Sequence, residues 1–338
     1  MMKVAVDAMG GDYAPREIVA GSVAAAEELG VEVLLVGPEP VLRQELGRFR
    51  LRSRRITVVD APELVAMDED LLSIRHKRQS SIIAGTQLLK RGQAEAFISM
   101  GNTAAVTFIS RKVLGSLEGI DKPALALLVP TQKGVSLLID VGASANCQPY
   151  HLVQFALMGS VFMETALGRP NPTVALISIG EERNKGNTLI INAHQELQRS
   201  PLNFIGNVEG KDLFRGVADV IVSDGFTGNV TLKVSEGVIE TIAAMAKKEI
   251  GGNLLARIGF LFLRKQLKKI YKKVDYSEYG GAHLLGVKGI CIIGHGRSDR
   301  KAVKNAIRLG QKIAAEKIQE KIQDKMQKFV QACEGVKG

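Results

Sequence analysis

The feature that most constrains the fold of this chain is a unit that recurs six times: a β-rich run, a polar loop containing glycine, and a helix-like segment. The runs and their loops are Lys3–Ala8 with Met9–Asp12, Ala96–Ser99 with Gly101–Thr103, Val135–Val141 with Gly142–Ser144, Thr173–Ile179 with Gly180–Gly186, Asp219–Ser223 with Asp224–Asn229, and Gly289–Ile293 with Gly294–Ser298. The runs are continuously apolar, as in strands buried on both faces. Strands alternating with helices predict an α/β fold with a mostly parallel sheet covered on both sides.

The loops of these six units are predicted to meet. Right-handed crossovers place the strand-to-helix loops of a parallel sheet at one edge, and ligands bind at that carboxyl edge. Glycine also ends strands and begins turns without any functional role, so one such loop is weak evidence. Six loops that carry Asn, Asp, Lys and His side chains favour a binding site over unrelated turns.

Length and cysteine usage bound the class of protein. The 338 residues suffice for one large α/β domain or two smaller lobes, and we expect residues 1–338 to form a single catalytic unit. Three scattered cysteines argue against a disulfide framework and a zinc ribbon, and fit a reducing compartment. No signal-peptide pattern opens the chain, and its apolar runs are shorter than the roughly 20 residues of a spanning helix. We therefore expect a cytoplasmic protein that does not cross a membrane.

The net charge of +10 predicts an acidic partner, and residues 251–273 indicate one kind. This segment combines basic side chains with the apolar residues Leu254, Leu255, Ile258, Phe260, Leu261 and Phe262. An apolar and basic segment is typical of contact with an anionic membrane surface. The alternatives are a dimer contact with a solvated basic face and the steering of an acidic carrier protein. Nucleic acid is disfavoured, because aromatic residues are only 5% and no recognition motif is present.

Several kinds of catalytic chemistry lack their motifs in this sequence. It has no Gly-x-Gly-x-x-Gly, no Walker A and no Gly-x-Ser-x-Gly, and its five histidines are too dispersed to predict a metal centre. A reaction in which phosphate is the nucleophile needs none of these. It needs backbone N–H groups that bind anions, a lysine, and donors for an oxyanion. The polar loops supply all three.

At these loops the sequence resembles the PlsX family of phosphate acyltransferases. The matching stretches cover nearly the whole chain in order: VAVDAMGGDYAP (Val4–Pro15), SMGNTAA (Ser99–Ala105), DVGASANC (Asp140–Cys147), GEERNKGN (Gly180–Asn187), FIGNVEG (Phe204–Gly210), SDGFTGNVTLKVSEG (Ser223–Gly237), EYGGAHLLGVKG (Glu278–Gly289) and IIGHGRS (Ile292–Ser298). Two positions depart from the family pattern: Ala104 replaces a glycine and Ser144 an asparagine.

This resemblance implies a three-layer α/β/α fold like that of isocitrate and isopropylmalate dehydrogenases. It implies transfer of an acyl group from acyl carrier protein to inorganic phosphate, for phospholipid synthesis, with no metal or cofactor. It also implies a homodimer that associates peripherally with the inner face of the cell membrane, where a membrane glycerol-3-phosphate acyltransferase uses the product. The family's catalytic lysine and asparagine match Lys185 and Asn229.

Each candidate residue has a structural alternative. For Lys185 the alternative is a solvated loop lysine, and for Asn229 a helix N-cap. The other candidates for substrate or phosphate binding are Asp7, Gly10, Gly11, Asp12, Asn102, Thr103, Asp224, Gly228 and His295. For Asp12, Asn102 and Thr103 the alternative is helix capping, and for His295 a structural hydrogen bond. We expect Asp224 to orient Lys185.

Three other functions remain open at this point. The same fold could use coenzyme A thioesters of short acids, or it could be a nicotinamide dehydrogenase, although no metal-binding carboxylate cluster is evident. A non-enzymatic scaffold at the membrane surface is the third.

Overall fold

The computed structural model describes residues 1–50, 55–74, 76–252, 260, 262–266 and 276–335. In these parts of the chain eleven strands form one sheet in the order β3-β2-β1-β4-β11-β10-β5-β6-β9-β7-β8. The strands are β1 (Lys3–Asp7), β2 (Glu32–Gly37), β3 (Ile56–Asp60), β4 (Ala96–Ser99), β5 (Ala124–Thr131), β6 (Gly134–Ile139), β7 (Val174–Ser178), β8 (Phe204–Glu209), β9 (Val220–Val222), β10 (Ala282–Leu285) and β11 (Ile290–Ile293). The six predicted runs are β1, β4, β6, β7, β9 and β11.

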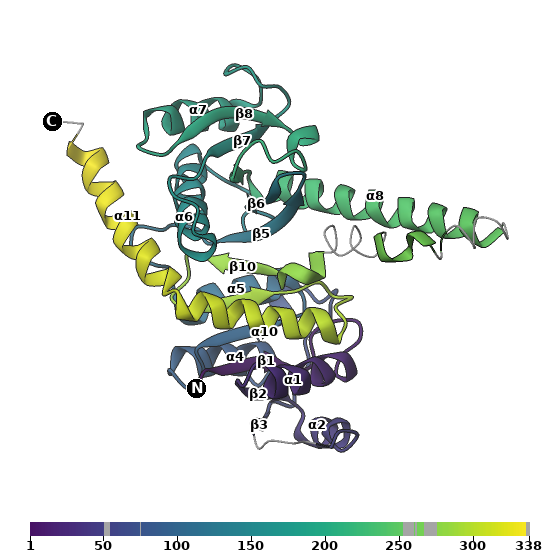
Figure 1. Cartoon of the computed structure of the whole chain (residues 1–338). Helices are drawn as coiled ribbons and strands as arrows, with labels where there is room; N and C mark the ends of the chain where they lie inside the picture. The colour runs from purple at the N-terminus through teal and green to yellow at the C-terminus, as the bar shows by residue number, and fades with distance from the viewer. Residues whose placement is uncertain (51–54, 75, 253–259, 261, 267–275, 336–338) are drawn as a thin grey trace.

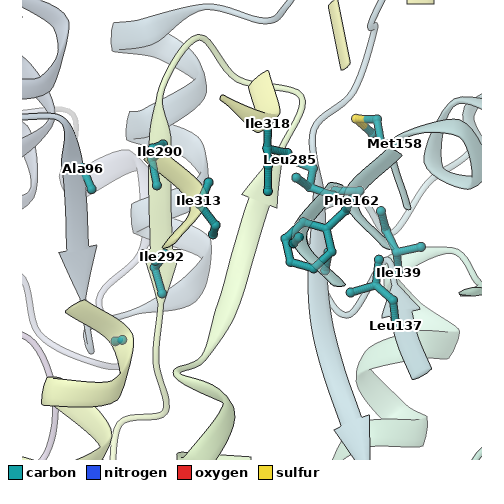
Figure 2. Close-up of a cluster of buried hydrophobic side chains, with 14 of the residues drawn as sticks. Ala96, Leu137, Ile139, Met158, Phe162, Leu285, Ile290, Ile292, Ile313 and Ile318 are labelled. Atoms are coloured by element: carbon teal, nitrogen blue, oxygen red, sulfur yellow. The ribbon is translucent and has the colours of Figure 1, made fainter. Parts of the chain in front are cut away.

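The sheet consists of two parallel halves that run in opposite directions. Strands β3, β2, β1, β4 and β11 are parallel to one another, and so are β6, β9, β7 and β8. Between the halves, β11–β10, β10–β5 and β5–β6 are all antiparallel, and three reversals leave the second half antiparallel to the first. Figure 2 shows this directly, since Ile290 lies above Ile292 on β11 whereas Ile139 lies above Leu137 on β6.

The expectation that all six loops share one edge of the sheet is therefore wrong. The loops after β1, β4 and β11 lie at one edge, and the loops after β6, β9 and β7 lie at the other. The crossover rule holds only between parallel strands of one sheet, and the antiparallel strands β10 and β5 interrupt it.

Helices cover both faces of the sheet, which confirms the predicted three-layer α/β/α architecture (Figure 1). They are α1 (Arg16–Glu28), α2 (Glu39–Leu46), α3 (Leu71–Ile74), α4 (Ser81–Lys90), α5 (Thr103–Leu114), α6 (Pro149–Leu167), α7 (Thr188–Arg199), α8 (Gly225–Gly252), α10 (Arg300–Ala315) and α11 (Ile318–Gly335), with 3₁₀ turns at Gly210–Asp212 and Tyr276–Tyr279. None of the helices within the described residues combines the length and the apolar character needed to cross a membrane.

Successive residues of a strand enter opposite cores, because side chains alternate across a sheet. On β11, Ile290 and Ile292 pack with α1, α6, α7, α10 and α11. Cys291 and Ile293 pack on the other face, with α4, α5 and Leu232 of α8. Figure 2 shows part of the first core, where Phe162 of α6 lies near Leu285 of β10.

Helix α8 is the element that leaves this body. Its first turns pack against the sheet, and its side chains from Thr241 to Glu249 are all exposed. Figure 1 shows the helix projecting to the right of both halves. The beginning of α8, rather than its tip, therefore contributes to any site at the sheet.

Candidate active site

The loops after β1, β4 and β11 form the first group of predicted site residues, and they touch through their backbones. The Gly294 N–H donates to the Ser99 carbonyl over 2.9 Å, and the Asp12 N–H donates to the Gly296 carbonyl over 2.7 Å. A Cβ on Gly10 would lie 2.6 Å from the Gly101 nitrogen, so only glycine permits this approach. The structure therefore brings together the predicted loops that carry Asp7, Gly10 and His295.

Asp7 stabilises this corner from inside. Its carboxylate is fully buried, accepts a 2.6 Å hydrogen bond from the Ser99 hydroxyl, and accepts a second bond, of 3.1 Å, from the Met9 N–H. Burial raises the pKa of Asp7, while the hydrogen bonds from Ser81, Ser99 and the backbone oppose that shift. Asp7 consequently shapes the turn and is covered from solvent.

Asn102 is a helix cap in this structure. Its Oδ1 accepts a 3.0 Å hydrogen bond from Ala105 N–H at the start of α5, where Thr103 is the first helical residue. Its Nδ2 donates to the carbonyls of Met67 and Glu69, at 2.9 and 3.3 Å. These bonds engage both ends of the amide, so the capping alternative is observed, and the contact with phosphate stays a prediction.

Asp12 does not cap a helix. Helix α1 follows Pro15 and has no side-chain cap, and the Asp12 side chain is exposed. The capping interpretation of Asp12 is therefore wrong. Gly11 has a φ of +105°, which glycine adopts readily, and it allows the chain to turn between β1 and α1.

The loops after β6, β9 and β7 form the second group, and Asp140 organises it. Its carboxylate accepts hydrogen bonds from the N–H groups of Leu125 (2.9 Å), Gly142 (3.0 Å), Ala143 (2.9 Å) and Ser144 (2.7 Å). Burial raises the pKa of Asp140 to about 6, against the opposing effect of these four bonds. The anion-binding nest at Gly142–Ser144 is thus filled by the protein's own carboxylate.

Helix α8 begins directly on this loop. A side chain on Gly228 would clash with the Asp140 carbonyl, which also accepts a 2.9 Å hydrogen bond from Ser223. Gly228 is buried there and serves close packing, and its predicted contact with substrate stays a prediction. The backbone at the start of α8 therefore packs directly against the backbone at Asp140, which fixes the position of this helix end.

Asp224 caps α8. Its carboxylate accepts hydrogen bonds from Phe226 N–H (3.0 Å), Thr227 N–H (2.9 Å) and the Thr227 hydroxyl (2.7 Å). Within the described residues these bonds all go to the first turn of the helix, and none joins Asp224 to Lys185. The expectation that Asp224 orients Lys185 is replaced by the capping role.

Asn229 lies in the second turn of α8, so it is not the N-cap that the sequence left open. Its Nδ2 donates a 3.1 Å hydrogen bond to the Val141 carbonyl. A Cβ on Gly142 would lie 2.7 Å from this nitrogen, so the glycine makes room for the amide. An amide nitrogen carries two hydrogens, and the second is available to another acceptor.

Lys185 follows β7, which is the neighbour of β9 in the sheet. Its backbone is fixed by bonds from Lys185 N–H to the Glu182 carbonyl (2.9 Å) and from the Ser178 hydroxyl to the Lys185 carbonyl (3.0 Å). Its side chain is exposed and forms no ion pair with any other described residue. Because β7 and β9 are parallel neighbours, the loops of Lys185 and Asn229 leave the sheet at the same edge.

His295 connects the two groups of loops through α8. Its Nδ1 accepts from Arg297 N–H at 3.1 Å, and its Nε2 lies 3.3 Å from Lys233 Nζ and 3.7 Å from Glu236 Oε2. Lys233 and Glu236 are themselves paired at 3.0 Å. Sequence analysis missed Lys233, Glu236 and Asp140. For Lys233 and Glu236 a signal was available, because they stand four and seven residues after Asn229 and so lie on the same helix face.

The described cysteines are not poised as nucleophiles. Burial raises the pKa of Cys147 to about 11 and that of Cys291 to about 12, so both are thiols at neutral pH. Across the residues that the structure describes, no three His, Cys, Asp or Glu side chains gather in a way that could hold a metal ion. Among the described residues, the distinctive groups of the second edge are a lysine without an ion-pair partner and an oriented amide.

Solved structures share this fold. A EutD phosphotransacetylase from Staphylococcus aureus is similar with a TM-score of 0.58 and 13% identity, covering 93% of this chain and 94% of its own. A 4-hydroxythreonine-4-phosphate dehydrogenase from Klebsiella pneumoniae gives a TM-score of 0.54 and 15% identity, covering 93% and 99%. The protein therefore has the α/β fold of these phosphotransacetylase and dehydrogenase structures.

Sequence comparison defines the family within that class. The model of a family described as fatty acid synthesis protein matches residues 2–321. A phosphate acyltransferase of Heliobacterium modesticaldum is 48% identical over 316 residues, which are 92% of this chain and 93% of that protein. This chain belongs to the fatty acid synthesis protein family, the PlsX family that its loops resemble, and it is an acyltransferase.

Proposed function

We propose that the protein transfers a fatty acyl group from the thioester of acyl carrier protein to inorganic phosphate. A phosphate oxygen attacks the thioester carbonyl carbon, a C–O bond forms, and the carbonyl oxygen becomes an oxyanion. Collapse of this intermediate breaks the C–S bond and releases the carrier as a thiolate, leaving an acyl phosphate. A thiolate is a good leaving group, so the site needs no strong acid.

The observation that carries this proposal is that Lys185, in the loop after β7, and Asn229, in the second turn of α8 after β9, follow adjacent parallel strands. The Lys185 ammonium lacks a carboxylate partner among the described residues and is suited to phosphate. The spare N–H of Asn229 is suited to the oxyanion. Both Cys147 and Cys291 are protonated thiols, which favours direct attack by phosphate over attack by either of them.

The direct test is release of free carrier thiol from purified acyl carrier thioester, with and without phosphate. The proposal expects release only with phosphate, and an equal amount of acyl phosphate. An acyl coenzyme A donor in parallel separates this function from the short-acid alternative. Thiol release that ignores phosphate would contradict the proposal.

We also propose that the whole chain works as one catalytic unit in a homodimer, with α8 as the contact. A stripe of apolar side chains, each 47–67% exposed, runs along the face of α8 turned away from Asn229: Phe226, Val230, Val234, Val238, Ile242 and Met245. An exposed apolar stripe of this length on a projecting helix is typical of a protein contact, and the same stripe on a second copy is its complement. Sedimentation of the wild type and of Val234→Asp tests this: we expect a dimer and a monomer respectively.

The cytoplasmic face of an anionic membrane is the third element of the proposal. Of the six predicted contact residues, Leu254, Leu255, Ile258 and Leu261 lie outside the described residues. Phe260 is described and half-buried. Phe262 is described and 80% exposed, and Arg264 and Lys265 follow it as exposed basic residues. An exposed aromatic beside basic groups favours an anionic bilayer, where a glycerol-3-phosphate acyltransferase would take up the product. Flotation with anionic and neutral vesicles tests this, with binding expected only to anionic vesicles.

A further inference from the structure

A narrow apolar cleft lies beneath the first turns of α8, on the face of the sheet opposite to α6 and α7. Helix α8 forms one wall through Leu232 and Ile239, the β5–β6 hairpin forms the floor through Leu127, Val129 and Leu138, and Leu213 closes one side. Its lining is aliphatic or aromatic apart from Ser235 and Glu236 of α8. The described helices α4 and α5 pack on the other half of this face, so α8 and the residues around Leu213 are its main cover here.

On α8 the lining of the cleft begins at Leu232, within one helical turn of the proposed oxyanion donor. Leu232 and Glu236 stand three and seven residues after Asn229, so all three lie on the same face of α8. From Asn229 to Ile239 an α-helix rises by about 15 Å, which is comparable to an extended fatty acyl chain. A chain whose carbonyl lies at Asn229 is therefore directed along the helix over apolar surface.

We propose that this cleft receives the hydrocarbon chain of the acyl donor, with its carbonyl end at Asn229 and its methyl end at Ile239. This inference rests on the proposed function, and it specifies where that function holds its substrate. Burial of each methylene against leucine and valine side chains favours binding through the hydrophobic effect. The Glu236 carboxylate hydrogen-bonds Lys233, so its charge is compensated at the rim.

The cleft has a volume of ≈ 30 Å³, so a chain enters only as α8 moves outward from the hairpin. Within one protomer, residues Thr241–Glu249 of α8 are exposed and do not hold the helix against the hairpin. Among the described residues, no neighbouring heavy atom lies within 4 Å of where a Cβ of Gly237 would be, and glycine weakens a helix at this point. The start of α8 is packed against Asp140 and stays in place while the later turns of the helix move.

The test is the dependence of turnover on acyl chain length in Ile239→Trp, with Ala243→Trp as the matched control. Ala243 is exposed one turn further along the same helix face. With carrier thioesters of long and short acids, we expect Ile239→Trp to lower kcat/KM for the long chain at least tenfold and to keep the short chain within twofold. Ala243→Trp should leave both unchanged. Ile239→Ala lengthens the cleft and should shift the preference toward longer chains.

The possible failures are distinguishable. An unchanged chain-length profile in both Ile239 variants would overturn the cleft as the acyl site, while the short-chain turnover of the wild type would still support the proposed function. Equal loss for every chain length in a variant with the wild-type melting temperature would also overturn it. Absence of phosphate-dependent thiol release in the wild type with every donor would instead refute the proposed function itself.

Discussion

The side-chain amide of Asn229 donates a 3.1 Å hydrogen bond to the main-chain carbonyl of Val141, and this bond ties the start of α8 to the loop after β6. The two residues follow neighbouring parallel strands, β9 and β6. The bond orients one N–H of the amide inward and leaves the other for a ligand. The amide is therefore preorganised, which is the property that makes an oxyanion donor effective.

Replacement of Asn229 tests this role. Asn229→Asp keeps the shape but exchanges the donor for a carboxylate that faces the Val141 carbonyl, so we expect kcat to fall by about 10²–10³. Asn229→Ala should lose a similar factor. Steady-state kinetics with acyl carrier thioester measure both. Asn203→Ala, a remote exposed amide that bonds Asn171, is the control. Turnover within threefold of the wild type in Asn229→Ala would remove this amide from the mechanism.

Two glycines of the same helix should respond oppositely to alanine. Gly228→Ala places a methyl group against the Asp140 carbonyl, so we expect destabilisation by about 1–3 kcal/mol or more. Gly237→Ala enters open space on an exposed helix, so we expect stabilisation by about 0.5–1 kcal/mol. Urea unfolding of both variants measures the pair. Equal effects would mean that the start of α8 is not packed as described.

His283 makes stability depend on pH. Burial lowers the pKa of His283 to about 3, with its Nε2 3.0 Å from Gln319 Nε2. The folded pKa lies below the unfolded value of about 6.5, so the unfolded chain binds the proton first as pH falls. The free energy of unfolding should therefore fall by about 1.4 kcal/mol per pH unit between pH 6.5 and 3 from this residue.

The variant His283→Leu isolates that contribution. Between pH 6.5 and 3, we expect the free energy of unfolding of this variant to fall less steeply than that of the wild type. The difference in slope should be about 1.4 kcal/mol per pH unit. His76→Gln, at an exposed histidine, should retain the wild-type slope. Parallel pH profiles for the wild type and His283→Leu would show that His283 is not held in its neutral form.

The strands were predictable, and the direction of the two halves was not. Each of the six runs became a strand because a continuous apolar run with a terminal glycine is a local signal. The reversal depends on β10, a four-residue strand at Ala282–Leu285 that pairs with β5 more than 150 positions earlier. No local sequence pattern shows how many antiparallel strand pairs lie between the two parallel halves of the sheet. The prediction that all six loops lie at one edge of the sheet was therefore wrong.

The motifs indicated candidate residues, but they did not reveal which of these residues cap a helix or bond a distant loop. Lys185 and Asn229 follow adjacent strands, as a shared site requires. Asn102 was a candidate for phosphate, but its amide bonds the carbonyls of Met67 and Glu69, which are more than thirty positions away in sequence. A side chain of Asn or Asp after a strand suits a cap and a ligand equally, and only its partners decide between them.

The measurement that tests the account most directly is the rate of acyl phosphate formation by Lys185→Ala, with Lys133→Ala as a control at another exposed lysine. Both variants should melt at the wild-type temperature, because neither side chain is buried. The account predicts that Lys185→Ala loses at least two orders of magnitude in turnover while Lys133→Ala keeps wild-type activity. Near-wild-type formation of acyl phosphate by folded Lys185→Ala would contradict it.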